Sequence, residues 1–168
     1  MDKTFILKSS SITIRQYVKL VLGLYFKDWW WAYVLPVLVC LILGAFNSNF
    51  FYVAVILVFL IFSMMFSFVY IYHGLVPESR YSIKEKEIKI TNDGFELIYS
   101  EVNSSGNIEE RSEILKWDLF KNIFAKDEFI LVMFNSRKYA FLAIPFNAFE
   151  KEDMLKESVL FVSDHLSD

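Results

Sequence analysis

The chain has 168 residues, of which 55% are hydrophobic and 18% aromatic, with one cysteine and a formal net charge of −3. This length leaves room for one modest soluble domain beside any membrane segment, and a single cysteine excludes an internal disulfide and cysteine-based metal sites. Residues 74–168 hold 12 Lys and Arg against 18 Asp and Glu. This acidic balance argues against a nucleic-acid partner, which would require a basic face.

The N-terminal segment, residues 1–28, is predicted to carry an amphipathic helix. Between Ser11 and Phe26, apolar side chains recur at helical spacing, with polar ones on the other side. Ser11 or Thr13 is the expected cap, and residues 27–28 are the expected break before the next segment. Two placements remain open for this helix: it lies in the membrane interface, or it continues into the following apolar run.

Two uncharged apolar runs follow, at residues 29–46 and 50–72, separated by Asn47, Ser48 and Asn49. Crossing the hydrocarbon core takes about 20 apolar residues, so the pattern predicts a two-span membrane hairpin over residues 29–73. Its distance from the N-terminus and its second run exclude a signal peptide. Because transport and proton relay usually need ionisable groups inside the bilayer, and none lies here, the hairpin is expected to act as an anchor.

Charges and aromatic residues around the hairpin predict its orientation. Lys and Arg lie on both outer flanks and are absent from the connecting loop, so both termini are expected in the cytoplasm. Aromatic side chains at the span ends are expected to form a membrane-interface belt, with a ligand-stacking platform as the alternative; they are Trp29, Trp30, Trp31, Tyr33, Tyr70 and Tyr72. Just beyond the second span, Arg80, Lys84 and Lys86 are candidates for contact with anionic lipid headgroups.

Residues 77–168 are predicted to form an α+β domain that follows a short linker over residues 77–87. Period-two patterns and turn signals mark six strands, at residues 88–91, 95–99, 107–114, 119–125, 129–134 and 139–144. The strongest turn signals are Asn92-Asp93-Gly94 and residues 103–106. After Pro145 an apolar stripe at helical spacing predicts a terminal helix. Antiparallel strands capped by one C-terminal helix match the outline of a pleckstrin-homology-like barrel, which a strand at residues 5–7 would complete.

Three short stretches of this domain resemble the YcxB-like family of bacterial membrane proteins. They are residues 117–124, 127–131 and 143–149. Members of that family have two membrane helices near the N-terminus and a C-terminal domain in which a tryptophan opens a strand and an Ile-Pro-x-x-x-Phe segment precedes the last helix. Trp117, Pro145 and Phe149 occupy those positions here, and are expected to be structural. The resemblance implies a multi-pass protein of the bacterial cytoplasmic (inner) membrane, and it supplies no catalytic residues.

A search for chemistry in the domain predicts no catalytic, cofactor-binding or metal site, and hence no enzyme. His165 is the domain's one histidine, and no cysteine accompanies it, so Cys-His nucleophilic pairs are excluded. Glu109, Glu110 and Glu113, with Arg111, form the densest charge cluster. On an alternating strand these side chains divide between two faces, which favours an exposed edge strand over a catalytic pair.

Three functions remain open on this basis. We favour a membrane-tethered binding or scaffold module that holds a peptide, protein or lipid group near the bilayer, which predicts an exposed apolar or basic groove between the barrel and the terminal helix. The second is a regulatory or immunity-type subunit whose hairpin pairs with another membrane protein. The third is an enzyme acting on lipid or envelope precursors, which would need a deep pocket with at least two convergent titratable groups. The expected partners are the lipid bilayer and an unidentified protein or peptide.

Overall fold

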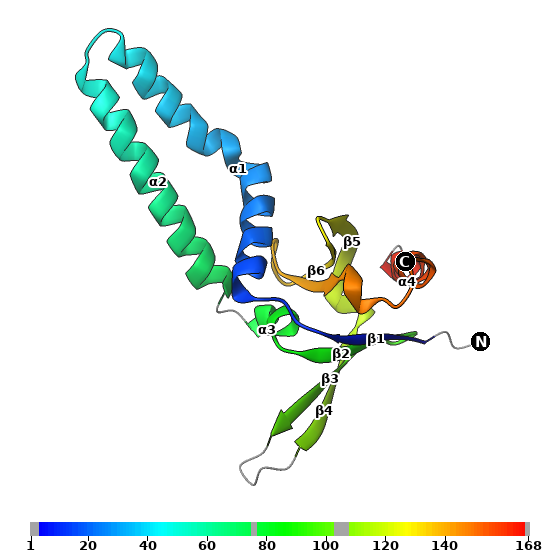
Figure 1. Cartoon of the computed structure of the whole chain (residues 1–168). Helices are drawn as coiled ribbons and strands as arrows, with labels where there is room; N and C mark the ends of the chain where they lie inside the picture. Colours follow the sequence, from blue (N-terminus) through cyan, green and yellow to red (C-terminus); the bar gives the residue numbers. More distant parts are fainter. Residues whose placement is uncertain (1–3, 75–76, 103–107, 167–168) are drawn as a thin grey trace. The chain divides into compact units, whose positions relative to one another are not determined.

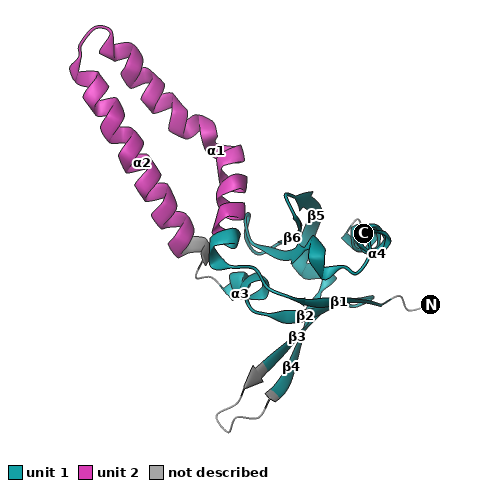
Figure 2. Ribbon diagram, in the orientation of Figure 1, with its two compact units in different colours: residues 1–17, 76–168 teal, residues 18–75 magenta. Residues whose placement is uncertain are grey.

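The computed structural model describes residues 4–74, 77–102 and 108–166, with the backbone alone at 72–74, 101–102 and 108. The chain divides into two compact units, coloured separately in Figure 2. The first, here called the sheet unit, comprises residues 1–17 and 76–168. The second, the hairpin unit, comprises residues 18–75. The N-terminal segment therefore belongs to the same unit as the C-terminal part of the chain.

Two long helices, α1 (Ile14–Gly44) and α2 (Asn49–Gly74), contribute the hairpin unit (Figure 1). Both are long and apolar enough to cross a membrane. The prediction of a break at residues 27–28 is wrong, because α1 runs through both residues without interruption. Lys and Asp are tolerated inside a helix, so a charged pair alone does not end one.

The start of α1 is fixed by a capping box, in which two side chains and two backbone groups bond reciprocally. Thr13 Oγ1 accepts a hydrogen bond from the backbone N–H of Gln16 at 3.2 Å, and Gln16 Oε1 accepts one from the N–H of Thr13 at 2.9 Å. Of the two predicted caps, Thr13 is therefore the one that is used.

The sheet unit contains two antiparallel sheets and two further helices. One sheet has the order β1-β2-β3-β4, formed by Phe5–Ser10, Lys86–Thr91, Gly94–Val102 and Ile108–Lys116. The other has the order β5-β6-β7, formed by Phe120–Lys126, Phe129–Phe134 and Phe141–Pro145. Short 3₁₀ turns lie at Trp117–Leu119 and Phe146–Ala148, and α4 (Glu152–Leu166) closes the chain. The predicted combination of a helical hairpin with an antiparallel α+β part is confirmed.

Helix α3 (Pro77–Ile83) occupies most of the segment that the sequence predicted to be a linker, so that prediction is wrong. Proline at the first helical position and an acid in the first turn both favour a helix start, and Pro77 and Glu78 supply them. The helix packs on β7, where Ser82 Oγ donates to the carbonyl of Phe141 at 2.8 Å and accepts the N–H of Ala143 at 2.9 Å. One serine thus satisfies two backbone groups of an outer strand.

The predicted turn at Asn92-Asp93-Gly94 joins β2 to β3 and depends on its glycine. Gly94 has φ +145°, and a Cβ built on it would lie 2.0 Å from the carbonyl oxygen of Leu115. Only glycine accommodates such a close backbone approach at positive φ. The second predicted turn, at residues 103–106, lies outside the described residues.

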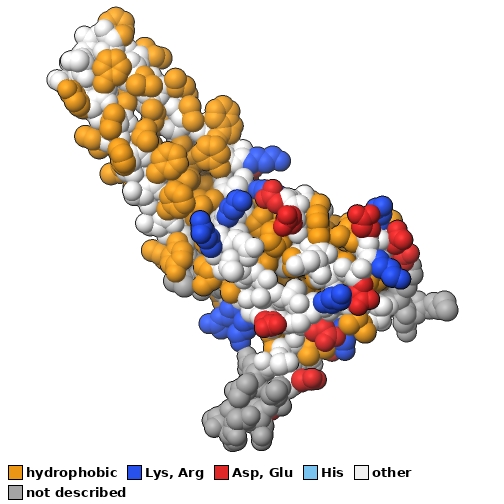
Figure 3. Space-filling view, viewed as in Figure 1, with side chains coloured by type: hydrophobic (Ala, Val, Ile, Leu, Met, Phe, Trp, Pro, Cys, Tyr) orange, Lys and Arg blue, Asp and Glu red, His pale blue; other side chains and the backbone are white. Residues whose placement is uncertain are grey.

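The core of the sheet unit lies between its two sheets and is capped by α4. Alternate residues of β2 and β3 point inward, and meet the inner residues of β6 and β7. The fully buried members include Ile88, Ile90, Phe95, Leu97, Val132, Leu142 and Ile144. Figure 3 shows the opposite distribution on the hairpin, whose surface is covered by hydrophobic side chains, whereas Lys, Arg, Asp and Glu gather on the sheet unit.

Candidate functional site

An apolar groove runs between β5 and α4 of the sheet unit. It has a volume of about 410 Å³ and is lined by Ile123, Phe124, Ala125, Ile130, Phe146, Leu155, Lys156, Val159 and Leu160. Among the described residues that line the groove, Lys156 is the one with an ionisable side chain. The exposed groove that the sequence analysis expected between the strands and the terminal helix is therefore present, and it is apolar.

The groove combines a strand edge with exposed apolar side chains. Strand β5 is the outer member of its sheet and pairs with β6 on one side only. Across the groove, Leu160 of α4 is 64% exposed and lines the trough. An outer strand presents backbone N–H and C=O groups to an incoming extended chain, and neighbouring apolar pockets then accept its side chains. This arrangement suits binding rather than acid–base chemistry.

A second hollow, of about 230 Å³, lies where α3 faces β3 and β4. It is lined by Pro77, Arg80, Tyr81, Lys84, Tyr99, Arg111 and Glu113. The Tyr81 hydroxyl donates a hydrogen bond to Glu113 Oε1 at 2.9 Å, and Lys84 Nζ lies 5.7 Å from the centre of the Tyr99 ring. Partial burial raises the pKa of Tyr81, and the bond to Glu113 raises it further, so the phenol stays protonated. The hollow thus holds three cationic side chains and one carboxylate.

Two of the three predicted lipid contacts lie at this hollow, and the third is wrong. Arg80 and Lys84 are exposed and line it. Lys86 is only 2% exposed, and its Nζ donates to the carbonyls of Ser82 and Lys84, each at 3.2 Å. It begins β2 on the face that also carries the buried Ile88, so it points inward instead of toward solvent. Burial lowers the pKa of Lys86 to about 8.

The prediction that Glu109, Glu110, Arg111 and Glu113 lie on an exposed edge strand is confirmed, because β4 is the outer strand of its sheet and all four side chains are exposed. The prediction did not include the hollow that Arg111 and Glu113 line. The register pairs Arg111 with Tyr99 and Glu113 with Leu97, and directly opposed residues share a face. Both charged side chains therefore lie on the face that elsewhere carries the core. The sequence did contain a signal for this placement, because side chains two residues apart on a strand share a face. Arg111 and Glu113 lie four and two residues before Leu115, which is a core residue.

The aromatic side chains predicted for the membrane interface lie along α1 and α2. Trp29, Trp30, Trp31 and Tyr70 are exposed, Tyr33 is half-buried, and the side chain of Tyr72 is outside the described part of the chain. The Trp29 ring lies 6.1 Å from that of Trp31 and 6.5 Å from that of Tyr25. Outward-facing rings on a long apolar helix fit the proposed belt, which remains a prediction.

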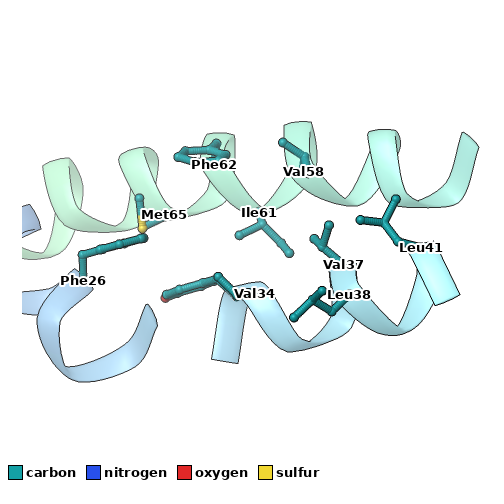
Figure 4. Close-up of a pocket in the computed structure, with 10 residues that line it drawn as sticks. Phe26, Val34, Val37, Leu38, Leu41, Val58, Ile61, Phe62 and Met65 are labelled. Carbon is teal, nitrogen blue, oxygen red and sulfur yellow. The ribbon is translucent and has the colours of Figure 1, made fainter. Parts of the chain in front are cut away.

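Between α1 and α2 lies a gap of about 320 Å³, shown in Figure 4. Its lining comes from both helices and consists of Phe26, Tyr33, Val34, Val37, Leu38, Leu41, Val58, Ile61, Phe62 and Met65. The labelled side chains converge on one another from the facing sides of the two ribbons. Among the described residues that line the gap, Tyr33 supplies the one polar group, a phenol, so the gap offers a mainly apolar surface.

The three residues of the family-like motifs have structural contacts. Trp117 Nε1 donates to the carbonyl of Asn92 at 2.8 Å, and its ring lies 5.0 Å from that of Phe95. Pro145 ends β7, and Phe149 is buried in the core beneath α4. Trp117 therefore connects the β2–β3 turn to the start of β5.

Among the described residues, no group of three or more His, Cys, Asp or Glu side chains is placed to hold a metal ion. No protein-family model, curated protein or solved structure matches the chain. A function for this chain is therefore inferred from three features of its structure: the groove between β5 and α4, the hollow at α3, and the gap between α1 and α2.

Proposed function

We propose that the protein is a membrane-anchored binding module whose groove between β5 and α4 holds an extended apolar segment of a partner protein. The observation that carries this proposal is the coincidence of an outer strand with an apolar trough of about 410 Å³ along it. Strand addition supplies affinity through backbone hydrogen bonds, and side-chain pockets supply selectivity. The exposed Leu160 gives the partner an apolar contact on the α4 side.

The fold supports the same interpretation. Sheets of four and three antiparallel strands followed by a C-terminal helix are compatible with a pleckstrin-homology-like barrel, and we propose both that fold and the YcxB-like relationship. Such scaffolds serve many unrelated ligands, so the fold alone carries no function. The groove lining, with Lys156 as the one ionisable residue among those described, supports binding over catalysis, because an enzyme site would need at least two convergent titratable groups.

The anchor in this proposal is the hairpin of α1 and α2. Strand β1 precedes the hairpin and pairs with β2, which follows it, through partners such as Phe5 with Ile90. Two paired strands must lie on the same side of a membrane, which supports a two-span topology with both chain ends together. The Lys and Arg on both flanks favour the cytoplasmic face of a bacterial inner membrane for that side.

Site-specific photo-crosslinking in native membranes tests the groove. The photoreactive residue p-benzoylphenylalanine replaces Leu160 or Ala125 in the full chain, and the adducts are identified by mass spectrometry. The matched control position is Ile114, an apolar residue that is 56% exposed on β4, away from the groove. We expect one polypeptide adduct from both groove positions and none from position 114.

An equal adduct at position 114 would contradict the proposal, as would adducts to lipid alone from the groove. A further variant, Leu160→Asp, places a charge in the apolar trough. It is expected to abolish the adduct at position 125 while leaving the melting temperature of the protein unchanged, since the side chain is exposed in the wild type.

A second candidate function is favoured by the gap between the helices. An apolar gap of about 320 Å³ facing the membrane offers a packing surface for a helix of another membrane protein. In this alternative the protein is a regulatory subunit, and the crosslinks come from the hairpin. A photoreactive residue at Phe62, which lines the gap, should then capture a membrane protein, whereas one at the exposed Ile56 should not.

A further inference from the structure

We propose that the hollow between α3 and the β3–β4 pair binds the phosphate of an anionic phospholipid headgroup, through Arg80, Lys84 and Arg111. This site is separate from the groove between β5 and α4. It depends on the hairpin being a membrane anchor, but not on a peptide binding in the groove.

The first argument is the position of the charges on the sheet. Strand β4 has Leu115 in the core, and two and four residues earlier along the same face it has Glu113 and Arg111. Beyond Leu115 this face of β4 leaves the core, since both Glu113 and Arg111 are exposed. These two line a hollow instead, and α3 brings Arg80 and Lys84 to the same place.

The second argument is the charge balance of the hollow. Among the described side chains that line the hollow, three cations face one carboxylate, and Glu113 Oε1 accepts a hydrogen bond from the Tyr81 hydroxyl. Neither Arg80 nor Arg111 forms an ion pair with a residue in the described part of the chain. An excess of positive charge in a shared concavity attracts an anion, and guanidinium groups match the oxygens of phosphate with two parallel hydrogen bonds.

The size of the hollow and its aromatic walls suit such a group. A volume of about 230 Å³ is many times the space that one water molecule needs, so the hollow admits a phosphate together with some of its hydration. The Tyr99 ring lies beneath Lys84 Nζ at 5.7 Å, which favours a defined position for the ammonium group. The Tyr81 hydroxyl holds Glu113 through its bond of 2.9 Å.

The third argument identifies a membrane lipid as the source of the phosphate. Helix α2 ends at Gly74 and α3 begins at Pro77. Three residues of chain span at most about 11 Å, whatever their path. The start of α3, and with it the Pro77 rim of the hollow, is thus held close to the end of a membrane helix. Anionic headgroups are concentrated at the cytoplasmic surface, where each basic side chain adds to binding.

The test measures lipid retention by the full-length protein. The protein is purified in a neutral detergent and examined by native mass spectrometry after addition of phosphatidylglycerol, phosphatidylcholine or inorganic phosphate. We expect the wild type to retain phosphatidylglycerol in preference to phosphatidylcholine. The double variant Arg80→Gln/Arg111→Gln should bind phosphatidylglycerol about 30-fold more weakly.

The matched control is Lys116→Gln/Lys121→Gln, which removes the same charge from two exposed positions outside the hollow. It should retain phosphatidylglycerol as the wild type does. A third variant, Glu113→Gln, removes the opposing carboxylate and should bind phosphatidylglycerol about fivefold more tightly. Because this variant gains binding, a loss of fold cannot produce the expected result.

Three results would overturn the proposal. They are unchanged phosphatidylglycerol retention by the double variant, equal weakening by the lysine control, and binding of inorganic phosphate with no preference for phosphatidylglycerol. The last result would assign the hollow to a free phosphate group. A normal crosslink from the groove positions alongside any of these would leave the proposed peptide-binding function standing.

Discussion

The two units of this chain use the same apolar residue types in opposite ways. In the sheet unit, Leu142 is fully buried at 0% exposure, whereas in the hairpin unit Leu60 is 52% exposed. The strands alternate between inward and outward residues, but the helices of the hairpin are apolar around most of their surface. The difference shows that the sheet unit is organised by its own core, whereas the hairpin needs an apolar surrounding. The predictions below test this contrast, from the largest expected effect to the smallest.

The substitution Gly94→Ala should unfold the sheet unit while sparing the hairpin. The added Cβ would meet the Leu115 carbonyl oxygen at 2.0 Å, and neither backbone can move without breaking the β3–β4 pairing. We expect a loss of about 4 kcal/mol or more, seen as loss of the cooperative melting transition in detergent. Membrane fractionation of the variant should match that of the wild type. An unaltered melting curve would refute the role given to this glycine.

The pair Leu142→Ala and Leu60→Ala applies one chemical change to both units. At Leu142 the truncation leaves a cavity in a packed core, which costs about 2–5 kcal/mol. At Leu60 the lost surface is exposed on the hairpin, and surface substitutions away from packed sites cost about 0.5 kcal/mol or less. Melting temperatures of the two variants in the same detergent give the comparison. Equal shifts would show that the hairpin has a core of its own at Leu60.

Lys86 is expected to make the stability of the sheet unit depend on pH. Its pKa is lowered from 10.5 to about 8 by burial, so between these values the unfolded chain binds more protons than the folded one. Stability should therefore rise as the pH increases through this window, by about 10 °C or more in melting temperature. The variant Lys86→Met should lack this rise in melting temperature. The control variant Lys89→Met, at a half-buried position of the same strand, should keep it. A flat wild-type profile would contradict the assignment.

The smallest effect is expected from Gly44→Ala at the end of α1. Its Cβ would approach the Phe51 ring at 2.9 Å, but that ring is exposed and can rotate away. We expect a change below about 1 kcal/mol and normal membrane insertion, measured by melting and by protease protection of the loop. A defect as large as that of Gly94→Ala would mean that the hairpin turn is as constrained as the β2–β3 turn.

Local patterns predicted much of the fold. The uncharged runs, the Asn92-Asp93-Gly94 turn and the apolar stripe of the terminal helix each contain their own signal, and each element is present. Helix α3 was missed because seven residues are too few to show a period. Its existence depends on packing against β7, a contact between distant parts of the sequence.

The candidate sites were less predictable because they depend on register. Lys86 was assigned to the surface because of its charge, but it lies on the same inward face of β2 as Ile88 and Ile90 and is buried. Arg111 became part of a hollow only through its pairing with Tyr99. Leu160 carried a visible signal, since it lies off the helical stripe that contains Leu155 and Val159. An apolar residue outside the stripe of an amphipathic helix could have indicated the groove.

The pairing of β1 with β2 also has a consequence for how the protein is made. Residues 5–10 are translated before residues 11–85, and their partner strand β2 is translated only after them. The four-stranded sheet cannot be completed until both hairpin helices have been synthesised. A chain in which only one of the two helices crossed the membrane would place β1 and β2 in different compartments and leave both edges open to proteases. The strand pairing thereby couples survival of the newly made chain to correct insertion.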